Sequence, residues 1–496
     1  MGDTQLKNDM TYWPFKVAQG DSGPAIDISG KYYPPEEIAS YLLKQIVQDA
    51  STYLRTPIKK VVITVPAYFT DGQRAATLDA GELAGLEVLE ILNEPTAAAI
   101  AYKLERFHEE SRNVLIFDMG GGTFDVAVIN TDSTSIEVLS VDGDTHLGGE
   151  DFDKALMHFC LKRFQEQHKV NPLVGNNLGT KTDKDVTKQR LRRLQTKCEN
   201  AKVQLSFAPE TTISVDSFYN GIDLLITIAR EEFEKLIESL FNKAIDIVDR
   251  VLKDAEISKR DIHDIVLIGG STRIPRVREL IIEFFDGKAL NHTISPDEAV
   301  AYGSAVKAAI LNGDQSKKMY NFKHIRDVIP RSLGIRTWMF DQEGQFTVII
   351  PKSSKIPAEA MQEFRTKLDN QSAVEIKIFQ GEERMADDNE YLGEFILSEI
   401  PPAPAGQEVI EVCMRVNNMG ILHVTAVCKS TNGSETLIVS ENKGRLSAET
   451  KKRIAGNKKI TKTNKENSDM PTLPHQQSQK KGGILRRLTT FKKTPK

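Results

Sequence analysis

Two different patterns of apolar and polar residues follow each other along the chain. From about residue 58 to 310, short runs that are apolar at nearly every position alternate with longer stretches of helical spacing. Such runs suit strands covered on both faces, and their alternation with helices is typical of an α/β domain. The predicted strands are 61–65, 88–92, 114–117, 124–129 and 265–268, and the predicted helices are 71–84, 95–106, 151–168, 183–205, 230–253 and 275–285.

The second pattern begins near residue 331, where apolar and polar residues alternate. Period-two alternation with turn residues between the runs, such as those at 417–420, predicts an antiparallel β domain. A polar, turn-prone stretch at 313–318 separates the two patterns, so we expect a domain boundary within about 313–330. The alternating runs are 346–350, 374–379, 408–412 and 421–427.

Charge is distributed unevenly over the 496 residues. Of the 65 Lys and Arg and the 69 Asp and Glu, residues 451–496 hold 14 and 2, which leaves 51 and 67 for the rest of the chain. With Asn, Thr, Gln, Ser and Pro between its lysines, this segment buries too little apolar surface to offset the entropy of ordering it. We therefore expect a disordered, solvated basic tail that contacts acidic surfaces and recognises no specific nucleic acid.

No segment has the composition of a membrane anchor or an export signal. The first ten residues carry no apolar core, and no run reaches the roughly 18 apolar residues that a membrane helix needs. The four cysteines, Cys160, Cys198, Cys413 and Cys428, lack the spacing of a metal site and suit reduced packing thiols. These features predict a cytoplasmic protein, with the nucleus as the other compartment they allow.

Candidate chemistry is concentrated at 114–128, where a strand ends in an acid, three glycines and a hydroxyl before the next strand begins. Gly120, Gly121 and Gly122 permit a tight hairpin whose N–H groups approach an anion without a Cβ in the way. Beside such a phosphate cradle, Asp118 is placed to hold a water bound to Mg²⁺, Thr123 to donate to phosphate, and Asp125 to orient a second water. A glycine-rich hairpin without ligand is the alternative. A Rossmann site is disfavoured, because these glycines lead into a strand and not into a helix.

A second segment, 265–275, runs from an apolar strand through Gly269 and Gly270 to a helix start. Ser271 or Thr272 is the expected N-cap, with Pro275 in the first turn. Helix N-termini favour anions, so this segment is a second candidate for contact with a phosphorylated ligand.

Upstream of it, Glu199, Lys202 and Ser206 are spaced to lie on one face of a predicted helix. That face is either one wall of a ligand site or a solvated surface with a Glu–Lys pair, and the spacing alone favours the solvated surface.

Five long motifs occur in an order that resembles the seventy-kilodalton heat-shock chaperone family. They are VPAYF (65–69), NEPTAAAI (93–100), FDMGGGTFD (117–125), GDTHLGGEDF (143–152) and IGGSTRIP (268–275). Shorter matches at 369–371, 401–404 and 442–446 extend the resemblance over about residues 9–446. It implies four parts: an actin-like nucleotide-binding domain at 1–316, an interdomain linker at 317–329, a β-sandwich substrate-binding domain at 330–445, and a lid stub with the basic tail at 446–496.

The resemblance also implies roles for individual residues in a site for ATP or ADP with Mg²⁺. The implied catalytic residues are Glu94, Asp118 and Asp125, with Asp118 holding the metal through water. The implied nucleotide contacts are Gly120, Gly121, Gly122, Thr123, Glu199, Lys202, Ser206, Gly269, Gly270, Ser271, Arg273 and Asp297. Pro66 and Arg74 match positions that relay the nucleotide state, and Trp338, Phe364, Val374 and Ile376 match the peptide slot.

This sequence departs from the family pattern in three ways. It opens downstream of the family's first phosphate hairpin and catalytic lysine, so we expect an incomplete first lobe and slow ATP hydrolysis. It carries Lys323, His324 and Arg326 where the linker is apolar in relatives, with Ile325 kept, so docking of the linker should desolvate charges and impair interdomain coupling. Leu78 and Glu90 replace basic residues, which should weaken binding of J-domain co-chaperones and nucleotide-exchange factors.

The sequence therefore predicts an ATP-binding chaperone that holds exposed apolar segments of unfolded proteins, with hydrolysis and coupling impaired. Whether the chain acts as an ATPase stays open. The alternative is a nucleotide-insensitive module that binds peptides or a partner, and an incomplete gene product without function is a further possibility.

Overall fold

The computed structural model describes most of the chain in separate stretches. These are residues 15–20, 23–106, 109–173, 181–291, 293–314, 324–339, 342–431 and 433–438, with positions 10, 13, 316, 322, 446 and 450–454. The chain forms two compact units, residues 1–445 and 446–496. In the second unit the described residues 450–454 are helical and Leu446 and Ile454 are buried. Most of the predicted basic tail lies outside the described residues.

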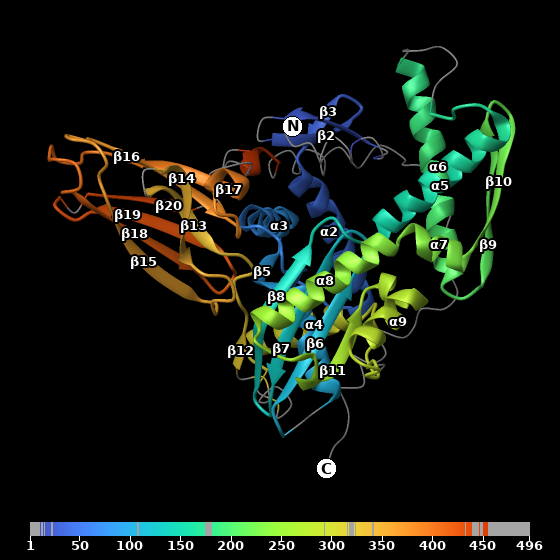
Figure 1. Cartoon of the computed structure of the whole chain (residues 1–496), viewed down its shortest axis with the longest axis horizontal. Coiled ribbons are helices and arrows are strands. Elements are labelled where there is room, and N and C mark those ends of the chain that lie inside the picture. The colour runs from blue at the N-terminus through green and yellow to red at the C-terminus, as the bar shows by residue number, and fades with distance from the viewer. Residues whose placement is uncertain are drawn as a thin grey trace. The chain divides into compact units, whose positions relative to one another are not determined.

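A five-stranded sheet forms the centre of the first unit (Figure 1). Its order is β11-β6-β7-β8-β12, in which β6 to β8 form an antiparallel meander, β11 is parallel to β6, and β12 is parallel to β8. The strands are β6 (Arg112–Met119), β7 (Phe124–Thr131), β8 (Ser135–Asp144), β11 (Ile262–Ile268) and β12 (His324–Arg326).

Helices cover both faces of this sheet, which explains why its strands are apolar at nearly every position. Leu115 and Phe117 face one core and Val114 and Ile116 face the other, because successive side chains of a strand point to opposite sides. The first core is covered by α5 (Gly149–His168), α6 (Lys181–Leu205), α7 (Arg230–Leu236), α8 (Glu238–Asp254) and α9 (Pro275–Phe284), and the second by α4 (Glu94–Glu105) and α10 (Ala299–Leu311).

The predicted single helix at 230–253 is wrong, because the structure divides it into α7 and α8 at Ile237. The Ile237 side chain is fully buried, and its backbone leaves the helical region with φ −113° and ψ 9°. The continuous helical pattern is thus interrupted at one buried apolar residue.

Smaller sheets and two further helices complete the α/β part. The parallel pair β4 (Lys60–Val65) and β5 (Glu87–Asn93) flanks α3 (Asp71–Ala84), whose N-terminus is closed by a capping box between Thr70 and Gln73. The other elements are the sheet β1 (Lys16–Gly20), β2 (Gly23–Ile28), β3 (Lys31–Tyr33), the helix α2 (Pro35–Leu54) and the hairpin β9 (Glu210–Tyr219), β10 (Ile222–Ala229). No helix among the described residues is long and apolar enough to cross a membrane.

The alternating pattern forms two four-stranded antiparallel sheets that share one core. The buried residues of this core come from both sheets, and the burial of β19 alternates strictly along the strand. One sheet, in spatial order, is β14 (Gln342–Ile350), β13 (Leu333–Met339), β16 (Val374–Gln380) and β17 (Glu390–Leu397). The other is β15 (Ala358–Arg365), β18 (Val409–Val416), β19 (Leu422–Cys428) and β20 (Ser434–Ile438). We call these eight strands the β-sandwich.

The predicted linker contributes β12, and this corrects one argument made from the sequence. His324 and Arg326 are exposed, whereas Ile325 is half-buried against the core that contains α4. Because side chains alternate along a strand, docking buries Ile325 and leaves its two neighbours in solvent. The predicted desolvation is therefore wrong for His324 and Arg326, and Arg326 lies 3.9 Å from Glu137. Lys323 lies outside the described residues.

Candidate functional site

The turn between β6 and β7 exposes backbone that no side chain covers. Its ends are tied by a 3.0 Å hydrogen bond from the Gly120 N–H to the Thr123 carbonyl. Gly121 and Gly122 are exposed, and a Cβ on either would meet no atom within 4 Å. The space beside the turn is thus open to a ligand that the backbone N–H groups can reach.

The start of α5 is joined directly to this turn. The Gly149 N–H donates to the Gly120 carbonyl at 3.1 Å and the Glu150 N–H donates to the Gly121 carbonyl at 2.7 Å. A Cβ at Gly148 would lie 2.6 Å from the Gly121 oxygen, so only glycine fits there. A helix N-terminus, which carries partial positive charge, therefore lies next to the β6–β7 turn.

Three carboxylates, two of them buried and that of Glu94 half-buried, lie at the base of the turn. Asp118 and Asp125 are cross-strand partners on β6 and β7, and Glu94 begins α4. Burial raises the pKa of Asp118 well above its usual range, and Glu94 and Asp125 raise it further. Burial and Glu94 raise the pKa of Asp125 to about 7, although Tyr68 and Ala67 backbone groups and the Arg74 guanidinium oppose the change. Burial also raises the pKa of Glu94.

These carboxylates fit a cation that is held through water. Acids that raise each other's pKa are stabilised by added positive charge. Among the described residues, no group of three or more His, Cys, Asp or Glu is arranged to bind a metal ion directly. Mg²⁺ keeps several waters in its shell when it is bound with phosphate, so the arrangement suits hydrated Mg²⁺ on a phosphate at the turn.

Lys202 of α6 reaches the same place. Its Nζ donates to the Gly149 carbonyl at 2.9 Å and to Asp153 Oδ2 at 2.8 Å, and its side chain is 13% exposed. Burial raises the pKa of Asp153 to about 6, against the effect of Lys202. Lys202 is therefore not the solvated lysine of the alternative interpretation. Ser206 donates to the Lys202 carbonyl at 3.4 Å, while the Glu199 side chain is exposed.

The loop after β11 packs against the turn from another side. Gly269 has φ +84°, and a Cβ there would lie 2.2 Å from the Met119 oxygen. The Ser271 hydroxyl donates to the Gly120 carbonyl at 2.8 Å. Arg273 and Asp297, both partly exposed, form a 2.6 Å ion pair, and Gly270 lies next to Asp297.

The predicted helix cap in this loop is wrong. Residues 270–273 form a 3₁₀ turn, and α9 begins at Pro275 with Ile274 at the N-cap position and no side-chain cap. The Ser271 hydroxyl is used in the contact with Gly120, and Thr272 donates to the Gly269 carbonyl at 2.7 Å. Both hydroxyls therefore hold the loop instead of capping the helix.

Three segments thus meet at one carbonyl, and a fourth, α6, is joined to them through the neighbouring carbonyl of Gly149. The Gly120 oxygen accepts from the Gly149 N–H and from Ser271, and Lys202 binds the carbonyl of Gly149. Gly148, Gly149 and Asp153 were not predicted to have a role. The sequence did contain a feature that could have indicated this contact, since two glycines precede the acidic first turn of α5 within the motif at 143–152.

The four predicted peptide residues are divided between surface and core. Trp338 is 43% exposed, with Lys367 Nζ 3.1 Å from the centre of its ring. Phe364 and Val374 are half-buried against the β-sandwich core, and Ile376 is 2% exposed within it. In this conformation Ile376 contributes to packing, and no common surface of the four residues is formed.

Comparison with known proteins identifies the family. A family model described as Hsp70 protein matches residues 1–481. Heat shock 70 kDa protein 2 of Paracoccidioides lutzii is 46% identical over 90% of this chain and 66% of that protein, and heat shock cognate 70 kDa protein 3 of Dictyostelium discoideum is 47% identical over 90% and 69%. The ribosome-associated molecular chaperone SSB of Candida glabrata is 43% identical over 90% and 71%. The chain spans about two thirds of the length of these relatives, and it belongs to the Hsp70 family.

Proposed function

We propose that this chain is a nucleotide-binding chaperone of the Hsp70 type. It binds ATP or ADP with Mg²⁺ at the β6–β7 turn and holds extended apolar segments of unfolded proteins in the β-sandwich. The observation that carries the proposal is the meeting of the β6–β7 turn, α5 and the loop after β11 at the Gly120 carbonyl, with Lys202 of α6 bound to the adjacent Gly149 carbonyl.

Each part of the site has a distinct task in this proposal. The N–H groups of Gly121 and Gly122, with Thr123, bind the terminal phosphates. Glu94, Asp118 and Asp125 accept hydrogen bonds from waters around the metal, which supplies positive charge to the phosphates. Lys202 holds the N-terminus of α5 against the turn through Gly149 and Asp153. The residues that bind the ribose and base are Glu199, Ser206, Gly269, Gly270, Ser271, Arg273 and Asp297.

Turnover by this arrangement is slow. The Arg74 guanidinium opposes the raised pKa of Asp125, whereas burial and neighbouring carboxylates dominate the raised pKa of Asp118. A positioned cation or donor stabilises the transition state of phosphoryl transfer by about 3–4 kcal/mol, and the departures of the sequence from the family's catalytic motifs support binding over catalysis.

Partner binding at the surface of β5 also differs from the family pattern. Glu90 pairs with Lys307 at 3.1 Å, and both side chains are largely buried, at 16% and 13% exposure. This pairing engages the carboxylate that replaces a basic residue and supports the proposal that J-domain co-chaperones and nucleotide-exchange factors bind weakly.

Calorimetric titration of the full chain with Mg·ATP tests the proposal, together with a thermal melt at each nucleotide concentration. We expect weak, saturable binding and a rise in Tm that follows RT ln(1 + [L]/Kd). Neither heat of binding nor a change in Tm would support the nucleotide-insensitive module instead.

A further inference from the structure

The helix α2 leaves large apolar side chains in solvent. In the described part of the chain, 21 large apolar side chains are exposed, and α2 supplies five of them, whereas no other helix or strand supplies more than two. These five are Tyr41, Leu42, Ile46, Tyr53 and Leu54. α2 packs against α3, but the residues that it buries are Glu36 and Ser40. Exposed apolar side chains gathered on one element mark a contact surface.

The exposed side of α2 has the residue spacing of a coiled-coil seam. Steps of three, four, three and four residues connect its exposed side chains, which are Ala39, Leu42, Ile46, Asp49 and Tyr53. Such alternating steps follow the line along which one helix packs against another. Leu42 and Ile46, in the middle of this line, are 63% and 54% exposed. We call these five residues the α2 seam.

The neighbouring side of α2 is already used within the chain. Leu43, Val47 and Ala50 each follow a seam residue directly in the sequence, and all three are half-buried. Because consecutive residues of a helix are turned by about 100° from each other, these three lie beside the seam and not on it. The chain therefore covers one side of α2, and the α2 seam needs a different partner.

The seam residue Asp49 determines the direction in which two such helices pair. In a parallel pair each seam residue faces its own copy, so two Asp49 carboxylates would meet between the helices and repel each other. In an antiparallel pair centred on Leu42 and Ile46, these two side chains face each other across the contact. Asp49 then lies opposite Ala39 of the second copy, whose small side chain leaves the carboxylate open to water. The seam therefore favours antiparallel pairing.

The charges at the two ends of α2 favour the same direction. Its first turn carries Glu36 and Glu37, and Arg55 follows its last residue. Antiparallel pairing brings the acidic first turn of each helix near Arg55 of the other and sets the two helix dipoles in opposite directions. This charge complementarity supports a second copy of the chain as the partner of the α2 seam.

We infer that two copies of this chain associate through antiparallel packing of their α2 seams. The helix has 20 residues and is about 30 Å long, so the contact buries less surface than a standard interface of about 1,600 Å². We therefore expect weak, concentration-dependent dimers with a Kd of about 10–100 µM. The inference is independent of the proposed function, because no residue of the α2 seam belongs to the candidate site.

Sedimentation equilibrium of the full chain at about 1–200 µM tests the contact. Leu42→Lys and Ile46→Glu should each make the chain monomeric, because each variant places a charge in the seam. Both side chains already lie in solvent in a single chain, so the helix content by circular dichroism and the Tm should not change. Leu225→Glu is the matched control, because Leu225 on β10 is 65% exposed and outside the seam, and it leaves the dimer intact.

A mixture of the two variants tests the direction of pairing. In an antiparallel pair the new lysine of the Leu42→Lys chain faces the new glutamate of the Ile46→Glu chain, and the remaining Ile46 and Leu42 face each other. The mixture should therefore form a dimer that neither variant forms alone. In a parallel pair each new charge would face an apolar side chain, so an absence of dimers in the mixture overturns the antiparallel arrangement. A chain that stays monomeric at the highest concentration, or a dimer that persists in Leu42→Lys, overturns the inference, because the α2 seam is then not the contact between copies.

Discussion

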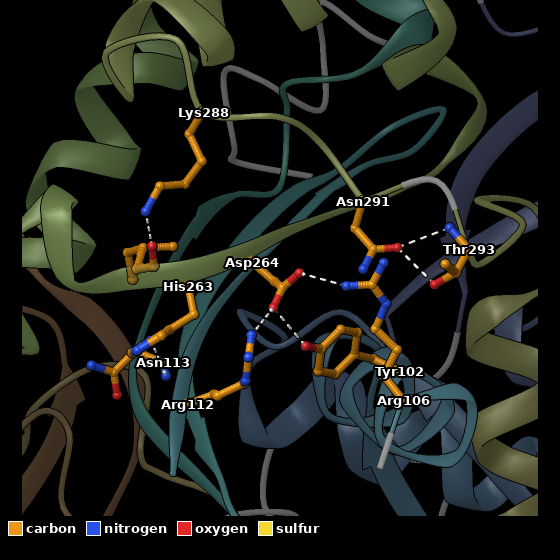
Figure 2. A network of polar contacts seen from close by, with 10 residues as sticks. Tyr102, Arg106, Arg112, Asn113, His263, Asp264, Lys288, Asn291 and Thr293 are labelled. Atoms are coloured by element: carbon orange, nitrogen blue, oxygen red, sulfur yellow. Dashed lines mark hydrogen bonds and ion pairs between the residues drawn. The ribbon is translucent and has the colours of Figure 1, made fainter. Parts of the chain in front are cut away.

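At the two ends of the central sheet, carboxylates lie in opposite electrostatic surroundings. Where β6 and β11 begin, Asp264 accepts hydrogen bonds from Tyr102 at 2.9 Å and from Arg106 and Arg112 at 3.1 Å each (Figure 2). Near the end of β6, burial together with Glu94 and Asp125 raises the pKa of Asp118. The same helix, α4, begins at Glu94 beside the second group and is followed by Arg106 in the first.

The comparison separates a structural ion cluster from a ligand site. At Asp264 the protein supplies all the compensating charge, so this end of the sheet is complete without a ligand. At Asp118 the compensating positive charge has to come from a bound cation. Without that cation, the buried acid destabilises the folded state. Substitutions at the two ends should therefore have opposite effects on stability and on nucleotide binding.

The largest effect is expected on nucleotide affinity. Asp118→Ala removes an acceptor for waters around Mg²⁺, and we expect Mg·ATP binding to weaken by about 3 kcal/mol, or roughly 100-fold. Calorimetry measures it, with Asp264→Asn as the control that leaves affinity unchanged. An equal loss of Mg·ATP affinity in both variants would show that the two ends of the sheet do not differ in nucleotide binding.

At the other end, Asp264→Ala should destabilise the fold by about 2 kcal/mol. The side chain is only 12% exposed, and its loss leaves the partners Tyr102, Arg106 and Arg112 without their shared acceptor. The side chains of Arg106 and Arg112 are 38% and 33% exposed, so water can solvate them in the variant and offset part of the lost stability. Urea unfolding at neutral pH gives the value, and a variant as stable as the unsubstituted chain would show that Asp264 is dispensable.

A smaller effect of opposite sign is expected from Asp118→Asn. Removing a carboxylate whose ionised form is disfavoured by burial and by Glu94 and Asp125 should stabilise the nucleotide-free chain by about 1 kcal/mol at pH 8 and weaken Mg·ATP binding. The gain should shrink as the pH is lowered, because the raised pKa of Asp118 favours its protonated form in the folded state. A loss of stability at pH 8 would mean that the charge of Asp118 is compensated within the protein.

The strands around the site could be predicted because burial on both faces makes β6, β7 and β11 apolar at nearly every position. The hairpin β9–β10 was missed, since it alternates between buried and exposed positions within a part of the chain where continuous runs were sought. The turn at 120–123 was predicted from residue type and spacing, whereas Lys202 was assigned to the site only by the family resemblance, since its spacing alone favoured a solvated surface. Gly149 and Asp153 were not, because their roles arise from contacts with Lys202, about 50 residues away, which local periodicity does not encode.

The pH dependence of unfolding tests the central claim most directly. The folded-state pKa of Asp125, about 7, lies above its ordinary value of 3.8, so the stabilising contribution is present below about pH 4 and is lost as the pH rises through about 7. Urea unfolding of the full chain at about pH 5.5 and pH 8 should show lower stability at pH 8. Saturating Mg·ATP should reduce that difference, because the metal compensates the ionised acids. An identical difference with and without Mg·ATP would contradict the account, since the three carboxylates would then not be the site of the cation.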